Sequence, residues 1–136
     1  MRLIYLTDAF FARYAACPEI LQKRDRPYAC LTVEIDGYTF AIPFRHHIAH
    51  RYAFFTVGEA GLDYSKAVVI EDESYISDNA AVIDSAEMKI IKGRESAIAS
   101  GMRRYYRIFL KAAAHRDNPH YGNIYRWSAL QYFLQP

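Results

Sequence analysis

The sequence predicts an α+β fold in which a small, strongly bent antiparallel sheet or barrel is flanked by helices. Three observations predict it: a hairpin pattern over residues 28–43, further apolar runs of strand length at 3–6 and 67–70, and a helical stripe over 94–114. The chain has 136 residues, 52% hydrophobic and 24% charged. Because no repeat or linker interrupts it, we expect one domain over residues 1–136.

The hairpin is the clearest element. Apolar and polar residues alternate on both sides of Asp36-Gly37, a pair typical of two-residue turns because these turns need positive φ angles. Such a turn fixes the register of the two strands and places the apolar side chains on one face. The predicted partners are Ile35 with Tyr38, Val33 with Phe40, and Leu31 with Ile42. The same register continued outward sets Tyr28 opposite Arg45, with His46 beside them.

The helices are expected around the hairpin. Thr7 or Asp8 begins a short helix that ends before Pro18, and Asp84 caps a second helix. A longer helix runs from about Arg94 to Ala114, with apolar residues at steps of three and four. After the break at Asp117-Asn118-Pro119, a final short helix is expected over residues 126–133.

Composition excludes several classes. Two cysteines without CxxC spacing, Cys17 and Cys30, indicate reduced thiols and no zinc site. No apolar stretch is long enough for a secretion signal or a membrane helix, so we expect a cytoplasmic protein with no membrane partner. A net charge of +2 says little by itself, since basic residues can still gather on one face.

The segment 43–52 carries three of the five histidines and two arginines at the exit from a buried strand. Three interpretations remain open: a solvated polar loop, a metal site, and phosphate chemistry. His46 and His50 have helical spacing, but no nearby acidic or thiol ligand completes a metal set. Histidine transfers protons near neutral pH, and arginine pairs with phosphate. Because RNA supplies its own 2′-hydroxyl nucleophile, a base, an acid and a cation suffice to cleave it.

Two further groups of residues can be interpreted either as RNA-binding or as ordinary surface residues. Lys66, with Tyr64 and Ser65, contacts phosphate or is a surface lysine before a strand. A helical stripe of Arg104, Arg107 and Lys111, near Tyr106, is an RNA-binding strip or a solvated helix face.

Several stretches resemble one toxin family. They are Leu6-Thr7-Asp8-Ala9-Phe10-Phe11, Cys17-Pro18-Glu19-Ile20-Leu21, Arg26-Pro27-Tyr28, residues 34–45, His47-Ile48-Ala49-His50 and residues 61–70, of which Leu62-Asp63-Tyr64-Ser65-Lys66-Ala67 and Ile42-Pro43-Phe44-Arg45 are the more specific. Over nearly the whole chain the sequence resembles the TenpN family, which belongs with ToxN, AbiQ and CptN among type III toxins.

The resemblance implies a barrel-like sheet similar to that of the MazF and Kid toxins, which is SH3-like. It implies an endoribonuclease, without a cofactor, that leaves a 2′,3′-cyclic phosphate and a 5′-hydroxyl. The partner would be a pseudoknot RNA antitoxin, cut from tandem repeats and assembled with the toxin into a closed ring. The roles would be abortive defence against phage and plasmid maintenance.

The predicted site combines both lines of argument. Tyr28 matches a tyrosine of ToxN-like toxins, whereas Arg45-His46-His47-Ile48 replaces their Thr-Ser-Pro-Lys and matches by position alone. Either His46 takes over proton transfer or Arg45 dominates. The predicted catalytic residues are Tyr28, Arg45, His46 and His47, and no metal ligand is predicted. The predicted RNA-binding residues are Arg26, His50, Tyr64, Ser65, Lys66, Arg104, Arg107 and Lys111. A non-catalytic RNA-binding or regulatory module is the alternative.

Overall fold

The computed structural model describes residues 1–22 and 27–134, and within them the fold is α+β, as predicted. Its strands form one antiparallel sheet in the order β1-β2-β3-β5-β4, with β6 also pairing with β3. The sheet stays open, because β1 and β4 at its two ends do not pair with each other. The strands are β1 (Leu3–Tyr5), β2 (Ala29–Ile35), β3 (Tyr38–Arg45), β4 (Ala53–Phe55), β5 (Gly61–Asp63) and β6 (Val68–Val69).

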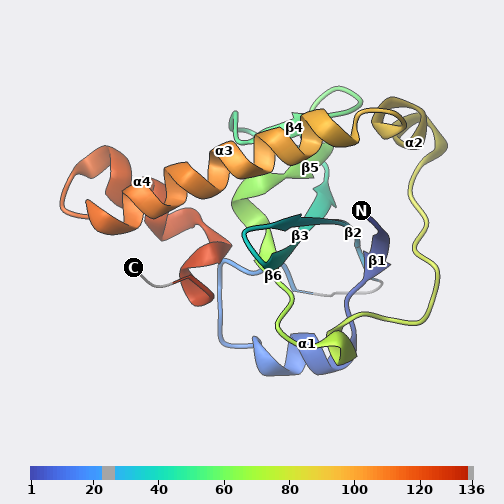
Figure 1. Cartoon of the computed structure of the whole chain (residues 1–136), viewed down its shortest axis with the longest axis horizontal. Helices are drawn as coiled ribbons and strands as arrows, with labels where there is room; N and C mark the ends of the chain where they lie inside the picture. Colours follow the sequence, from blue (N-terminus) through green and yellow to red (C-terminus); the bar gives the residue numbers. More distant parts are fainter. Residues whose placement is uncertain (23–26, 135–136) are drawn as a thin grey trace.

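Helices lie on both sides of this sheet (Figure 1). The α-helices are α1 (Asp8–Arg13), α2 (Ser85–Ile91), α3 (Glu95–Ala114) and α4 (Pro119–Trp127), and the 3-10 helices are η1 (Tyr64–Lys66), η2 (Glu73–Tyr75) and η3 (Ala129–Tyr132). The long helix α3 covers the face that carries the apolar hairpin residues, while α1 packs on the other face. The sheet is therefore buried on both sides.

The hairpin confirms the predicted register. Ile35 pairs with Tyr38, Val33 with Phe40, and Leu31 with Ile42. Asp36 and Gly37 have φ angles of 53° and 81°, the left-handed geometry that a two-residue turn of this kind requires. The first strand begins at Ala29, so Tyr28 lies just outside the ladder.

The strand β3 changes partners along its length, and this change creates the site. Phe40 and Ala41 pair with β6, while Phe44 and Arg45 pair with β5. Arg45 lies opposite Gly61, whose missing side chain is required there, since a Cβ atom would lie 2.2 Å from the Phe54 carbonyl oxygen. Close packing of β3, β5 and β4 thus brings the end of β3 against the end of β5.

The last helix differs from the prediction. We expected it over residues 126–133, but α4 begins at Pro119 and a separate 3-10 turn, η3, follows at Ala129–Tyr132. Asn118 caps α4 by accepting hydrogen bonds from the backbone N–H groups of His120 and Tyr121. The Asn-Pro pair that suggested a break is in fact a helix start, because proline is well tolerated at the first helical position.

Among the described residues, no helix is both long and apolar enough to cross a bilayer. Cys17 is half-buried and Cys30 is buried, and both are free thiols.

Candidate functional site

A buried carboxylate organises the most polar cluster of the structure. Asp63 ends β5 and has no exposed surface, yet four donors surround it. Its Oδ1 accepts hydrogen bonds from the Ser65 hydroxyl at 2.6 Å and the Ser65 backbone N–H at 2.9 Å. Arg45 Nη1 donates to Oδ2 at 2.6 Å, and His50 Nε2 lies 3.2 Å from the carboxylate. Residues from β3, the following loop and η1 therefore converge on one side chain.

These donors keep Asp63 ionised. Burial by itself would raise the pKa of Asp63, but hydrogen bonds from His50, Ser65 and Arg45 outweigh that effect and hold it below its usual range. A buried charge is tolerated only where partners of this kind are present. The carboxylate is a fixed anchor for the side chains around it.

Arg45 is held by the Asp63 carboxylate and keeps further N–H donors that make no bond to it. One of its five N–H donors goes to Asp63, and about a third of the side chain (31%) is exposed to solvent. The planar guanidinium is therefore positioned by the protein and still has donors for an anion from outside.

His50 has a defined tautomer. Its Nδ1 accepts a hydrogen bond from the Tyr52 backbone N–H at 3.0 Å, so the ring proton is on Nε2. That Nε2 lies 3.2 Å from both the Asp63 carboxylate and the Ser65 hydroxyl oxygen. In this tautomer Nε2 is a hydrogen-bond donor toward Asp63 or Ser65.

Lys66 adds a second cation beside Arg45. Its Nζ donates to the Trp127 carbonyl oxygen at 2.9 Å, which ties η1 to the end of α4. Burial lowers the pKa of Lys66, attraction to Asp63 raises it and repulsion by Arg45 lowers it, so that the net shift is downward. Two cations against one carboxylate leave the cluster with an excess of positive charge.

His46 and His47 are exposed at the end of β3 and line a shallow depression with Val57, Glu59 and Ala60. Among the described residues, neither makes a hydrogen bond to Asp63 or His50. His47 has a φ angle of 58°, a left-handed conformation that costs energy for any residue other than glycine. The loop thus presents two imidazoles to solvent, one of them on a strained backbone.

Two predicted residues lie elsewhere. The Tyr28 hydroxyl donates to the Leu21 carbonyl oxygen at 2.6 Å and its ring packs on Phe11, so it does not meet Arg45 within the described part of the chain. Tyr64 is buried, and its hydroxyl donates to the Ile98 carbonyl oxygen at 3.0 Å. Neither hydroxyl group is directed at the Asp63 cluster, and the roles of Tyr28 in catalysis and of Tyr64 in RNA binding stay predictions.

Arg26 falls outside the described residues. Tyr106, which lies near the basic stripe in sequence, is 8% exposed and packs its ring on Phe40. Helical periodicity explains this position, because Tyr106 lies four residues after Met102 and three before Phe109 and so shares their buried face.

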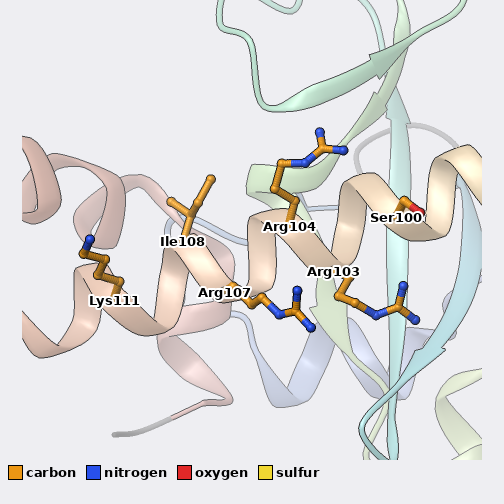
Figure 2. Close-up of a pocket in the computed structure, with 6 residues that line it drawn as sticks. All are labelled: Ser100, Arg103, Arg104, Arg107, Ile108 and Lys111. Atoms are coloured by element: carbon orange, nitrogen blue, oxygen red, sulfur yellow. The ribbon is translucent and has the colours of Figure 1, made fainter.

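The basic stripe on α3 forms a surface of its own. Arg103, Arg104, Arg107 and Lys111 are exposed and line an open groove of about 480 Å³ together with Ser100 and Ile108. In Figure 2, Arg103 and Arg107 point to the same side of the helix and Arg104 points to the other. We call these four residues the α3 basic strip. The sequence prediction contained three of them and missed Arg103.

Asp63 is the main residue that the sequence prediction missed. It lies within the Leu62-Asp63-Tyr64-Ser65-Lys66 segment, whose Tyr64, Ser65 and Lys66 are predicted RNA-binding residues. The signal was an acidic residue at the end of an apolar strand, directly before a serine and a lysine. Among the described residues, no cluster of three or more His, Cys, Asp or Glu side chains has the arrangement of a metal site.

Comparisons with known proteins complete the description. No family model matches the sequence, and no curated protein matches it. One solved structure, described as "A processed non-coding RNA regulates a bacterial antiviral system", matches with a TM-score of 0.62 and 15% sequence identity, over 82% of this chain and 87% of that chain. The predicted α+β fold is thereby confirmed.

Proposed function

We propose that this chain is the toxin of a type III toxin–antitoxin system and that it cleaves RNA without a metal ion. The observation that carries the proposal is the cluster in which buried Asp63 holds Arg45 and His50 at the mouth of a positively charged site. Support also comes from the fold shared with a protein of an antiviral system that a processed non-coding RNA regulates. The partner would be an antitoxin RNA that folds as a pseudoknot and closes a ring with the toxin.

The reaction is a transesterification within RNA. The 2′-hydroxyl attacks the adjacent phosphorus, the bond to the 5′-oxygen breaks, and a 2′,3′-cyclic phosphate and a 5′-hydroxyl result. Arg45 and Lys66 would neutralise the charge that grows on the phosphate oxygens. One imidazole must take the proton of the 2′-hydroxyl, and a second donor must protonate the leaving 5′-oxygen.

We assign the proton-transfer roles as follows. His50 would serve as the donor in its imidazolium form, which gives up the Nε2 proton and is left as a neutral ring, and this requires Nδ1 to release the Tyr52 N–H that it accepts in this structure. The exposed His46 and His47 are free to accept a proton, so one of them would act as the base. Asp63 does not touch the substrate in this scheme and serves as a positioning residue for Arg45 and His50.

The test is digestion of total RNA with the purified chain in the presence of EDTA, followed by analysis of the fragment ends. Cyclic-phosphate and 5′-hydroxyl ends that persist under chelation support the proposal. Binding of RNA without any cleavage would favour the alternative, a regulatory RNA-binding module on the same basic surfaces.

Variants assign the site within the same assay. Arg45→Ala should lower the cleavage rate by about 10²- to 10³-fold, the usual loss when one group that stabilises the developing charge is removed. Arg13→Ala is the matched control, since Arg13 is exposed on α1. If Arg45→Ala cleaves RNA and arrests growth as well as the unmodified chain does, the assignment of this cluster is wrong.

A further inference from the structure

A small apolar pocket opens beside the Asp63 cluster and shares two residues with it. His50 and Ser65 line it together with the aromatic residues Tyr52, Tyr105 and Trp127 and with Ile124. Its volume is about 220 Å³, below the ~300 to 1,000 Å³ of pockets that hold drug-sized ligands. The pocket therefore suits one flat ring system better than a whole nucleotide.

The walls of the pocket come from separate elements that the fold fixes in place. The Tyr52 and Tyr105 rings lie 5.6 Å apart, which joins the loop after β3 to α3. Trp127 ends α4, and its backbone carbonyl oxygen is the group that Lys66 Nζ contacts at 2.9 Å. One wall is thus attached directly to a cation of the proposed cleavage site.

Trp127 stands out within this wall. It is the single tryptophan of the chain, and its side chain is 61% exposed although a large aromatic surface is costly to leave in water. The guanidinium of Arg126 lies 5.8 Å from the centre of its ring. An exposed ring, a nearby cation and an apolar recess form the combination that proteins use to hold the bases of single-stranded nucleic acid.

We propose that this pocket, defined by Tyr52, Tyr105, Ile124 and Trp127, binds one unpaired nucleobase of the RNA strand whose phosphate lies at Arg45 and Lys66. The inference rests on the proposed function, because Arg45 and Lys66, which contact Asp63 and the Trp127 carbonyl oxygen beside the pocket, favour a polyanionic strand over an apolar peptide. Asn123, which also lines the pocket, supplies an amide of the kind that pairs with base edges. The pocket would therefore set which base flanks the scissile phosphate.

Fluorescence of Trp127 gives a direct test that does not need cleavage. The probe is a short single-stranded oligoribonucleotide with 2′-O-methyl groups, which block the nucleophile, and the control is an abasic chain of the same length and charge. The base-bearing probe should quench tryptophan emission and bind about 5- to 150-fold more tightly than the abasic chain. Equal affinity of the two probes, or quenching by both, overturns the proposal.

Variants separate the pocket from general RNA binding. With labelled probes, Trp127→Ala should lose the preference for bases over the abasic chain, while Trp127→Phe should keep most of it because a ring remains. Tyr38→Ala is the matched control, since Tyr38 is an exposed aromatic residue at the hairpin turn, and it should retain the full preference. A Trp127→Ala protein that still prefers the base-bearing probe over the abasic chain overturns the proposal that this pocket binds a base. RNA cleavage without a preference for bases would contradict this inference and leave the proposed function standing. A preference for bases without RNA cleavage would contradict the proposed function and leave base binding standing.

Discussion

The carboxylate of Asp63 is withdrawn from solvent but surrounded by donors from three segments of chain. Because these donors lower its pKa below that of the unfolded chain, the ionised form stabilises the fold. That contribution is complete above the unfolded carboxylate pKa of ~3.9 and is lost as the pH falls through the lower pKa of the folded state.

Asp63→Asn should remove the charge of residue 63 and, with it, this contribution to the pH dependence of stability. We expect a loss of about 1–3 kcal/mol in the free energy of unfolding at neutral pH, since the amide NH2 group replaces one accepting oxygen and leaves the donors that faced this oxygen without an acceptor. The loss relative to the unmodified protein should shrink as the pH falls below the carboxylate range. Denaturant unfolding at a series of pH values measures this difference, and a gap that is constant down to strongly acidic pH would argue against an ionised Asp63.

His47 provides a second prediction at this scale. Glycine at this position relieves the left-handed backbone, so His47→Gly should leave stability unchanged or raise it by up to about 1 kcal/mol. If His47 is the base, RNA cleavage should fall by about 10²- to 10⁴-fold at the same time.

His46→Gly is the control for that result, because His46 is not among the described residues with positive φ. Added glycine freedom in the unfolded chain should make this variant less stable. Denaturation and cleavage assays on the pair assign the base to the histidine whose loss reduces cleavage. Full cleavage by both variants would exclude the loop from proton transfer.

At the scale of single elements, α3 presents one buried and one exposed surface. Ile98, Met102, Tyr105 and Phe109 are buried against the sheet, whereas the α3 basic strip faces solvent. The core positions follow from helical periodicity and were predicted from the sequence. The groove between the basic side chains depends on their rotamers and could not be predicted in the same way.

We expect the α3 basic strip to hold RNA through its phosphates. The double variant Arg104→Ala, Arg107→Ala should weaken RNA binding and reduce the slope of log affinity against log salt by about 1.4, or ~0.7 for each phosphate contact. Titrations at several salt concentrations measure the slope. Removing two exposed lysines, with Lys89→Ala in α2 and Lys92→Ala directly after it, takes away the same charge elsewhere and should leave the slope nearly unchanged. Equal effects of the two double variants would mean that only net charge matters.

The hairpin shows what local sequence determines. Its register depends on Asp36-Gly37 and on alternation within sixteen residues, 28–43, so it was predictable without tertiary information. The start of α4 was also encoded locally, by Asn118 and Pro119, but the same pair is typical of loops. The hairpin was predictable because its sequence pattern is typical of one structure, whereas the Asn-Pro pair is typical of both loops and helix starts.

At the scale of the whole molecule, α3 packs tightly against the segment 63–66, which carries Asp63. A Cβ atom on Gly101 would lie 2.2 Å from the Tyr64 hydroxyl oxygen, and Tyr64 separates Asp63 from Ser65. The hydroxyl also binds the Ile98 carbonyl oxygen on the same helix. The position of α3 therefore determines the position of the loop that carries the carboxylate anchor.

Gly101→Ala tests that dependence. Alanine normally favours a helix over glycine by about 1 kcal/mol, but the clash with Tyr64 should reverse the sign and cost about 1–3 kcal/mol. RNA cleavage should fall as well, because Asp63 and Ser65 move with Tyr64. Thermal unfolding and cleavage assays measure both effects, and Tyr64→Phe in the same chain should restore part of the stability by removing the nearest atom. An alanine variant more stable than the unmodified protein would show that the loop adapts freely.

The composition of the site could be predicted only in part, for a reason that also belongs to this scale. Arg45, His50, Ser65 and Lys66 were predicted as functional residues, although with separate roles. Their meeting point depends on β3 pairing with β5, a contact between strands separated by a fifteen-residue connection, 46–60. Tyr28 was placed by extending the β2–β3 ladder, whose last pair is Cys30 with Pro43.

The open sheet leaves little edge for a second copy of the chain. β4 at one end has three residues, and β1 at the other is covered where Ser77 N–H donates to the Tyr5 carbonyl oxygen and Leu6 bridges to Ile76. Strands this short or this protected resist growth of the sheet from one molecule into the next. In the RNA assembly proposed above, neighbouring copies would then be joined through nucleic acid rather than through a shared sheet.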